Sequence, residues 1–324
     1  MYSMDIVKQI KTVITRLISL KPTISIESTV SRIMVILLIV TVFVLVRNHH
    51  RYTVEGFESA ASPPDFGVKR NVDTVYDKFY TGIYDSLVLS ESKNHFEMTS
   101  LMKTATFGKT SVLLDIGSGT GHHVNLFSKD AYRTVGLDLS PAMIARAKRN
   151  YPKEEYLLGD ATDSLMFQES QFSHVTCFYF TIYYIQDKRR FFANCFNWIH
   201  PGGHLMLHLV DRDTFDPILP AGSPFVLVPP QKYAKKRVMD TSVKFDTFKY
   251  SSKFELKGDR ATFHETFEDD ATDSIRKNEH HMEMEPHEYI LRIAQAEGFI
   301  LTKKTDMGQC GYDNQYLYTL QRTT

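Results

Sequence analysis

Three aspartates occupy comparable positions along the first half of the chain. Asp115, Asp138 and Asp160 each come just after a short apolar run, and these runs begin at residues 112, 134 and 156. Parallel strands end at the same edge of a sheet, so we expect the three carboxylates to share one crevice. There they can accept hydrogen bonds from the hydroxyl and amino groups of a nucleoside-like ligand. A helix N-cap is the alternative role for any one of them, but not for the set.

A glycine-rich turn follows the first of these carboxylates. Gly117, Gly119 and Gly121 let the backbone approach a ligand without a Cβ in the way. A helix is expected to begin at about Gly121, with its positive end facing the turn. The dinucleotide fingerprint requires its third glycine at position 122, where this chain has His122. An NAD-dependent oxidoreductase is therefore disfavoured, although it remains an alternative.

Apolar strand-like runs and helical patterns alternate along the rest of this region, which predicts an α/β fold with a parallel sheet and helices on both faces. The expected strands after the first three are residues 172–180 and 204–210, with a helix over 188–198 between them and a Pro-Gly-Gly turn at 201–203. A last helix begins at Pro286, and strands over 299–303 and 315–320 complete a sheet of seven.

The Asp-x-Gly-x-Gly-x-Gly turn after a strand, the acidic residues at the next two strand ends and the Pro-Gly-Gly turn resemble the class I S-adenosylmethionine (SAM)-dependent methyltransferases over residues 72–324. Within this family the chain looks most similar to uncharacterised methyltransferase-domain proteins of large DNA viruses, through residues 180–184, 208–213 and 215–219. The resemblance implies a Rossmann-like fold, SAM as the cofactor and methyl transfer as the activity.

The resemblance also implies which positions hold the cofactor. The methionine part is expected at Asp115, Gly117, Ser118, Gly119, Gly121 and the Phe178 carbonyl, the ribose at Asp138, and the adenine at Asp160, Ala161 and the face of Leu139.

The methyl acceptor and any catalytic residue are less well determined. Methyl transfer depends mainly on alignment of acceptor, methyl and sulfur, so no catalytic group is obligatory. The candidates to face the acceptor are Tyr183, Tyr184 and His208 near strand ends, and Tyr76 and Tyr84 in a helical region over 72–104. Core packing is the alternative for each of them.

Composition and absent motifs narrow the acceptor. The chain has 38 basic and 38 acidic residues, so no bulk charge favours nucleic acid, and no basic tract is interleaved with aromatic residues. No Asn/Asp-Pro-Pro-Tyr/Phe motif follows the fourth strand. A small molecule, a lipid or a protein side chain remains. No metal is expected, because His280, His281 and His287 lack supporting ligands and are interpreted as surface polarity.

The N-terminal region predicts attachment to a membrane. Residues 1–32 form a basic amphipathic segment, 33–47 an apolar run interpreted as a single transmembrane helix, and 48–70 a linker. The methyltransferase domain over 71–324 is expected to face the cytosol from a host or viral membrane. A non-catalytic SAM-binding or membrane-tethered interaction module is the alternative.

Residues 211–285 interrupt the alternation and are interpreted as a β-rich insertion that covers the substrate mouth. Strands are expected over 243–256 and 261–267, joined by a hairpin turn at 257–259, with a possible third strand over 278–284. The apolar run at 225–228 suggests a lipid-like or membrane-associated acceptor reached through this insertion, with packing of the run on the sheet as the alternative.

Overall fold

The computed structural model describes residues 34–35, 37–38, 67–70, 72–130, 132–220, 231, 234 and 236–323. The chain divides into two units, residues 1–53 and 54–324. The predicted amphipathic segment 1–32, the linker up to residue 66 and the apolar run 225–228 lie outside the described residues. So does the predicted membrane run, apart from four helical residues at 34–35 and 37–38. Within the described part of the chain, no helix combines the length and apolar character that crossing a bilayer requires.

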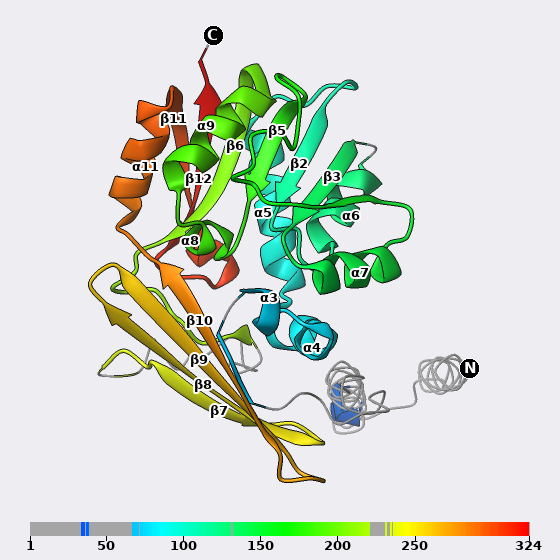
Figure 1. The fold of residues 1–324 in the computed structure, drawn as a ribbon, viewed down its shortest axis with the longest axis vertical. Coiled ribbons are helices and arrows are strands. Elements are labelled where there is room, and N and C mark those ends of the chain that lie inside the picture. Colours follow the sequence, from blue (N-terminus) through cyan, green and yellow to red (C-terminus); the bar gives the residue numbers. More distant parts are fainter. Residues whose placement is uncertain are drawn as a thin grey trace, which may run out of the picture. The chain divides into compact units, whose positions relative to one another are not determined.

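A seven-stranded sheet forms the centre of the second unit (Figure 1). Its order is β11-β12-β6-β5-β2-β3-β4, and the five strands from β6 to β4 run parallel. These are β2 (Val112–Ile116), β3 (Arg133–Asp138), β4 (Glu155–Leu158), β5 (Phe172–Cys177) and β6 (Ile199–Val210).

The last two strands make the sheet mixed rather than wholly parallel. β11 (Phe299–Asp306) and β12 (Gln315–Arg322) pair antiparallel, and β12 is antiparallel to β6. Only the 3₁₀ turn η2 (Met307–Cys310) and a few further residues join them. A parallel pair needs a long crossover, so this short connection dictates an antiparallel hairpin.

Helices cover both faces of this sheet, as predicted. Alternate residues of β2 show why: Leu114 packs in a cluster with α9 (Lys188–Trp198) and α11 (His287–Ala296), whereas Leu113 packs in a cluster with α5 (Glu91–Thr104) and α6 (His122–Lys129). α7 (Pro141–Asn150) follows β3 and shares a small apolar cluster with α6.

Among the parallel strands, two boundaries differ from the prediction by three residues or more. β5 ends at Cys177 instead of residue 180, because Tyr179 turns the backbone with a φ of 52° and α8 (Thr181–Tyr184) follows. β6 begins at Ile199, and its register against β5 shifts between Phe172 and His174. The Pro-Gly-Gly turn therefore lies within an irregular stretch of β6 and not before it.

A second sheet has the order β1-β10-β9-β8-β7 and lies below the first in the view of Figure 1. It contains β1 (Val68–Lys69), β7 (Asp240–Lys244), β8 (Phe248–Lys257), β9 (Arg260–Asp269) and β10 (Ile275–Glu283). The single strand predicted over 243–256 is wrong, because a turn closed by the Phe245 N–H on the Phe248 carbonyl divides it into β7 and β8. The hairpin at 257–259 is present, and β10 pairs with β9 as a further strand.

Two N-terminal helices pack on this second sheet. α3 (Val72–Val75) and α4 (Lys78–Val88) share an apolar cluster with β8 and β9, in which Tyr80 and Ile83 meet Phe248 and Phe267. The Arg276 guanidinium on β10 binds Asp77, the N-cap of α4, at 2.7 Å. The second sheet therefore places α4 beside the strand ends of the first sheet.

The buried His174 on β5 gives the fold a measurable dependence on pH. Its ring stacks on Phe107, with the ring centroids 3.9 Å apart, and burial lowers its pKa to about 3. An unfolded chain takes up this proton near pH 6.5, so below that pH the unfolded state binds more protons and the free energy of unfolding falls. We expect a loss of up to about 1.4 kcal/mol per pH unit between pH 6 and 4 from this group.

His174→Phe should make that slope shallower in urea unfolding measured at several pH values. The slope should not vanish, because burial also lowers the pKa of His208, to about 4. If the free energy of unfolding depends on pH equally in the unaltered protein and in His174→Phe, the low pKa of His174 is contradicted.

Candidate functional site

A cavity of about 530 Å³ lies at the carboxyl ends of the parallel strands and continues to the second sheet. This volume is in the range of small-molecule sites. Its wall combines the residues after β2, β3 and β4 with α4, α8 and β10. Every position that the sequence assigns to the cofactor lines this cavity except Gly121.

The glycine turn is tied to the neighbouring strand by its backbone. The N–H groups of Gly117 and Ser118 both donate to the Leu137 carbonyl, at 2.8 and 3.0 Å. Gly117 has a φ of 72°, and a Cβ there would collide with Thr181 on α8. Gly121, with a φ of 89°, caps α6 and packs against the Tyr156 hydroxyl. Glycine is thus required here by both conformation and space.

Asp138 connects this turn to the start of α7. Its Oδ2 accepts from the Gly119 N–H at 2.8 Å, and its Oδ1 accepts from the Ser140 N–H at 2.9 Å. Burial raises the pKa of Asp138, although these backbone hydrogen bonds oppose the rise. Each carboxylate oxygen can accept more than one hydrogen bond, so both can also serve two adjacent hydroxyls in the cavity.

Asp115 is the most deeply buried of the three aspartates. Its Oδ1 accepts from the Thr176 hydroxyl at 2.7 Å. Burial raises its pKa to about 6, against the opposing effects of His123 and the Thr176 hydrogen bond. A cationic group of a ligand beside Asp115 would favour its ionised form.

The third strand end has a different character. Asp160 is exposed and uses Oδ1 to accept from the N–H and hydroxyl of Thr162, both at 2.8 Å. Ala161 is buried behind it, and Leu139 is 46% exposed. These residues form an open, partly apolar edge of the cavity suited to a flat ring.

A buried ionic cluster lies near Asp115, which the sequence analysis missed. Lys93 on α5 binds Glu97 at 3.1 Å, and His123 binds the same carboxylate at 2.8 Å. Burial alone would raise the pKa of Glu97, but Lys93, His123 and His208 outweigh it and hold the pKa at about 2. The i,i+4 spacing of Lys93 and Glu97 was the available sequence signal. Lys93 and His123 also line the cavity.

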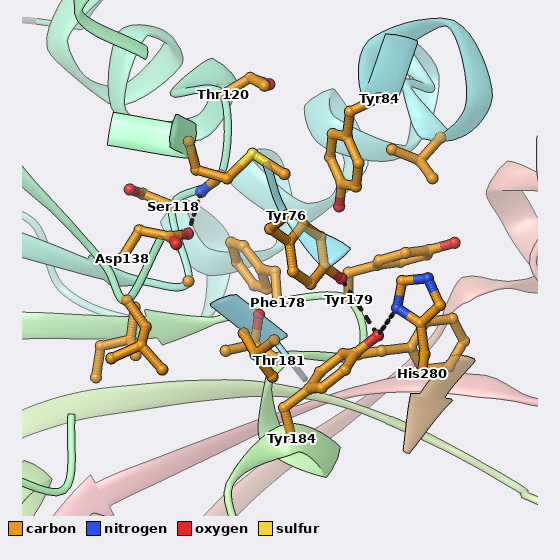
Figure 2. A pocket seen from close by; sticks show the side chains of 18 of the residues that line it. Tyr76, Tyr84, Ser118, Thr120, Asp138, Phe178, Tyr179, Thr181, Tyr184 and His280 are labelled. Atoms are coloured by element: carbon orange, nitrogen blue, oxygen red, sulfur yellow. Dashed lines mark hydrogen bonds between the residues drawn. The ribbon is translucent and has the colours of Figure 1, made fainter. Parts of the chain in front are cut away.

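The far end of the cavity is a tyrosine chamber, formed by Tyr76, Tyr80, Tyr84, Tyr179 and Tyr184. The Tyr76 ring centroid lies 5.5 Å from that of Tyr80, 6.1 Å from that of Tyr84 and 6.2 Å from that of Tyr184. Figure 2 shows Tyr76, Tyr84, Tyr179 and Tyr184 around the same space. Three of the predicted acceptor-facing residues therefore lie together.

Tyr183 and His208 are not part of this chamber. Tyr183 is buried on the opposite side of α8, where its hydroxyl accepts from the Val210 N–H at 2.9 Å. His208 is buried beneath the cavity and bonds to Gln315 at 2.9 Å. Neither residue lines the cavity. Successive residues of a helix or strand point in different directions, so a strand-end position alone did not determine which side chains face the ligand.

The interpretation of His280 as surface polarity is wrong. Only 4% of His280 is exposed, and its ring bonds to the Tyr184 hydroxyl at 2.8 Å and to Glu265 at 2.7 Å. Arg276, Asn278 and His280 alternate along β10 and point to its buried face, whereas His281 is exposed. The spacing of two residues was visible in the sequence, but it did not identify a buried face because the strand consists mostly of polar residues.

Sequence comparison finds relatives for the central part of the chain. Residues 114–207 match the family described as "Methyltransferase domain". A dTDP-4-amino-2,3,4,6-tetradeoxy-D-glucose N,N-dimethyltransferase of Saccharopolyspora spinosa is 30% identical over 137 residues, which are 40% of this chain and 54% of that protein. A dTDP-3-amino-3,4,6-trideoxy-alpha-D-glucopyranose N,N-dimethyltransferase of Streptomyces venezuelae is 26% identical over 136 residues, 40% of this chain and 56% of that protein. The chain thus spans about half the length of these relatives.

Solved structures extend the likeness in fold to most of the chain. The CcbJ methyltransferase of Streptomyces caelestis aligns with a TM-score of 0.58 and 15% identity over 78% of this chain and all of that one. The sugar N-methyltransferase KedS8 of a Streptoalloteichus species aligns with a TM-score of 0.55 and 19% identity over 83% of this chain and all of that one. Residues 114–207 therefore match a methyltransferase domain, and they lie within a region that shares the α/β fold of these methyltransferases.

Gly119→Arg should abolish SAM binding, because Gly119 has a φ of 54° and its missing side chain would point toward Tyr84 across the cavity. We expect a loss of more than about a hundredfold in affinity. Gly258→Arg is the matched control, since Gly258 has a φ of 60° but lies in an open hairpin turn. Calorimetry with SAM should show binding by the control only, and unchanged affinity in Gly119→Arg would refute the site.

SAM binding should weaken as the pH falls below about 6. The pKa of Asp115 is about 6 in the free protein, and the cationic methionine part of SAM favours the ionised carboxylate. Binding at lower pH must therefore release a proton, and the affinity should fall by roughly tenfold per pH unit. Asp115→Asn should bind more weakly at pH 8 and lose most of this dependence; a remainder is expected, because burial also raises the pKa of Asp138. A Kd for SAM that does not change with pH in the unaltered protein would count against the placement of the methionine part beside Asp115.

Proposed function

We propose that this protein transfers a methyl group from SAM to an amino group of a small molecule bound in the tyrosine chamber. The observation that carries this proposal is the continuity of the cavity, which runs from the strand ends past the glycine turn to the chamber. A donor at one end and an acceptor at the other would share one enclosed space. Alignment of the two is the main requirement of the reaction.

Two facts support an amine as the acceptor. The relatives from S. spinosa and S. venezuelae are both named as N,N-dimethyltransferases of amino sugars. The chamber is lined by tyrosine rings, whose faces attract cations, so it suits a protonated amine better than an anionic or apolar molecule.

The donor supplies a methyl group on a positively charged sulfur. Asp138 would hold the ribose, Asp115 the methionine amino group, and Asp160 with Ala161 the adenine. The rings of Tyr76 and Tyr179 would orient the acceptor and exclude water. The nitrogen lone pair forms the new N–C bond as the C–S bond breaks, and the electron pair stays on sulfur.

The sequence also suggests where the enzyme acts and what covers its acceptor. The apolar run 33–47 would tether the enzyme to a membrane, and the resemblance to methyltransferase-domain proteins of large DNA viruses would make it a host or viral membrane. The β7–β10 region would act as an insertion that covers the acceptor. A non-catalytic SAM-binding module is the competing function, because it would retain the same cofactor residues.

The direct test is methyl transfer from labelled SAM to the amino-sugar nucleotide named for the S. spinosa relative. We expect label on the sugar nitrogen. Asp138→Ala should weaken SAM binding by about 30- to 150-fold, from the loss of about 2–3 kcal/mol of charge-assisted hydrogen bonding. Asp163→Ala is the control, because Asp163 is exposed and caps its own turn. SAM binding without transfer to any amine would favour the non-catalytic module.

A further inference from the structure

A chain of hydrogen bonds leads out of the tyrosine chamber into the second sheet. The Tyr76 hydroxyl donates to the Tyr184 hydroxyl at 3.2 Å, and the Tyr184 hydroxyl lies 2.8 Å from Nδ1 of His280. Nε2 of His280 lies 2.7 Å from Oε2 of Glu265. Figure 2 shows the first two of these contacts as dashed lines. The three segments involved are far apart in sequence, and both tyrosines and His280 line the cavity.

Glu265 fixes the direction of this chain. The carboxylate is fully buried, and the hydrogen bonds that it accepts from Tyr250 and Asn278 favour its ionised form. An ionised carboxylate only accepts hydrogen bonds, so the hydrogen of the neutral His280 ring must be on Nε2. Nδ1 then presents a lone pair to the Tyr184 hydroxyl.

Glu265 is itself held in place by further contacts. Tyr250 donates to Oε1 at 2.9 Å, and Asn278 donates to Oε2 at 3.2 Å. The Asn278 side chain accepts from Arg276 at 2.9 Å, and Arg276 binds Asp77 at the start of α4. A supported carboxylate, a histidine of fixed tautomer and a hydroxyl at a cavity form a recognised arrangement for moving a proton.

We infer that His280 is the general base of the reaction, that Tyr184 relays the proton to it, and that Glu265 positions the ring. This inference rests on the proposed function, because it concerns the acceptor of that same site. It deepens that proposal by assigning the acceptor as a protonated amine that is deprotonated inside the protein.

The proton and electron balance is complete without another reactant. The acceptor ammonium gives a proton to the Tyr184 oxygen while the Tyr184 hydrogen passes to Nδ1 of His280. The neutral amine then attacks the methyl carbon, the C–S bond breaks, and S-adenosylhomocysteine leaves with the electron pair on sulfur. The methylated nitrogen carries the positive charge that the sulfur has lost. His280 returns its proton to water once the products have left.

The groups that face His280 suit this role. Glu265 from β9 is the charged neighbour, and it stabilises the imidazolium that forms. Tyr76, Tyr80 and Tyr184 contact the ring from the other side. Burial raises the pKa of all three phenols well above the ordinary value, so they stay neutral and relay protons without storing charge.

Two matched pairs of variants test the relay in the full chain. Tyr184→Phe and Tyr183→Phe each remove one buried hydroxyl, but only Tyr184 lies in the chamber. His280→Gln and His281→Gln form the second pair, because His281 points to the exposed face of β10. With the amino-sugar nucleotide, Tyr184→Phe and His280→Gln should lower kcat by roughly a hundredfold at pH 7. Their Kd for SAM should stay within about twofold, and the two control variants should keep kcat within about threefold.

The pH profile separates proton transfer from a structural effect. As the pH approaches about 10, the ordinary range for an alkylamine, the acceptor arrives neutral and needs no base. The hundredfold reduction in kcat should then shrink to less than about tenfold. Glu265→Gln should show a smaller reduction in kcat at pH 7, and this reduction should shrink in the same way. A merely structural role would leave the deficit constant with pH.

The outcomes distinguish this inference from the proposed function. If the unaltered protein methylates no amine, the proposed function fails and this inference fails with it. If the unaltered protein is active and Tyr184→Phe matches Tyr183→Phe, or if the deficit does not change with pH, the relay alone is overturned.

Discussion

The carboxylate of Asp138 joins the parts of the chain that form the floor of the cavity. One oxygen holds the backbone of Gly119 in the turn after β2, and the other holds Ser140 at the start of α7. The turn, the end of β3 and the helix therefore depend on one buried charge whose pKa burial has raised. A ligand hydroxyl bound there would replace the hydration that Asp138 loses in the folded state. The proposed cofactor site and the local fold are thus coupled through the same atoms.

The second sheet has an equivalent role at the other end of the cavity. Its buried face carries apolar residues where it meets α4 and polar residues where it meets the chamber. Arg276, Asn278 and Glu265 would be costly to bury singly, but each bonds to the next, and the series ends on Asp77. This network fixes α4, and α4 in turn supplies Tyr80 and Tyr84 to the chamber.

The grouping of the proposed cofactor residues around one cavity could be predicted from the sequence because these residues are local. A carboxylate after a strand and a glycine turn before a helix need only the order of the elements, and parallel pairing then brings Asp115, Asp138 and Asp160 to one edge. The tyrosine chamber combines α4, α8 and β10, whose meeting depends on a second sheet that periodicity alone did not position. His280 shows the limit most clearly, because a strand of polar residues looks solvated until its partners are known. Tyr183 and Tyr184 show a second limit of prediction from the sequence, because adjacent residues on one short helix face different surroundings.

Hydrogen exchange measured with and without S-adenosylhomocysteine, and then with an amino-sugar nucleotide added, tests the central claim most directly. The claim is that donor and acceptor occupy the two ends of one cavity formed by both sheets. We predict that S-adenosylhomocysteine protects residues 115–121, 138–143 and 159–162, and that the amino-sugar nucleotide then protects α4, α8 and β10. Protection confined to the first group after both additions, or protection of segments remote from the cavity, would contradict it.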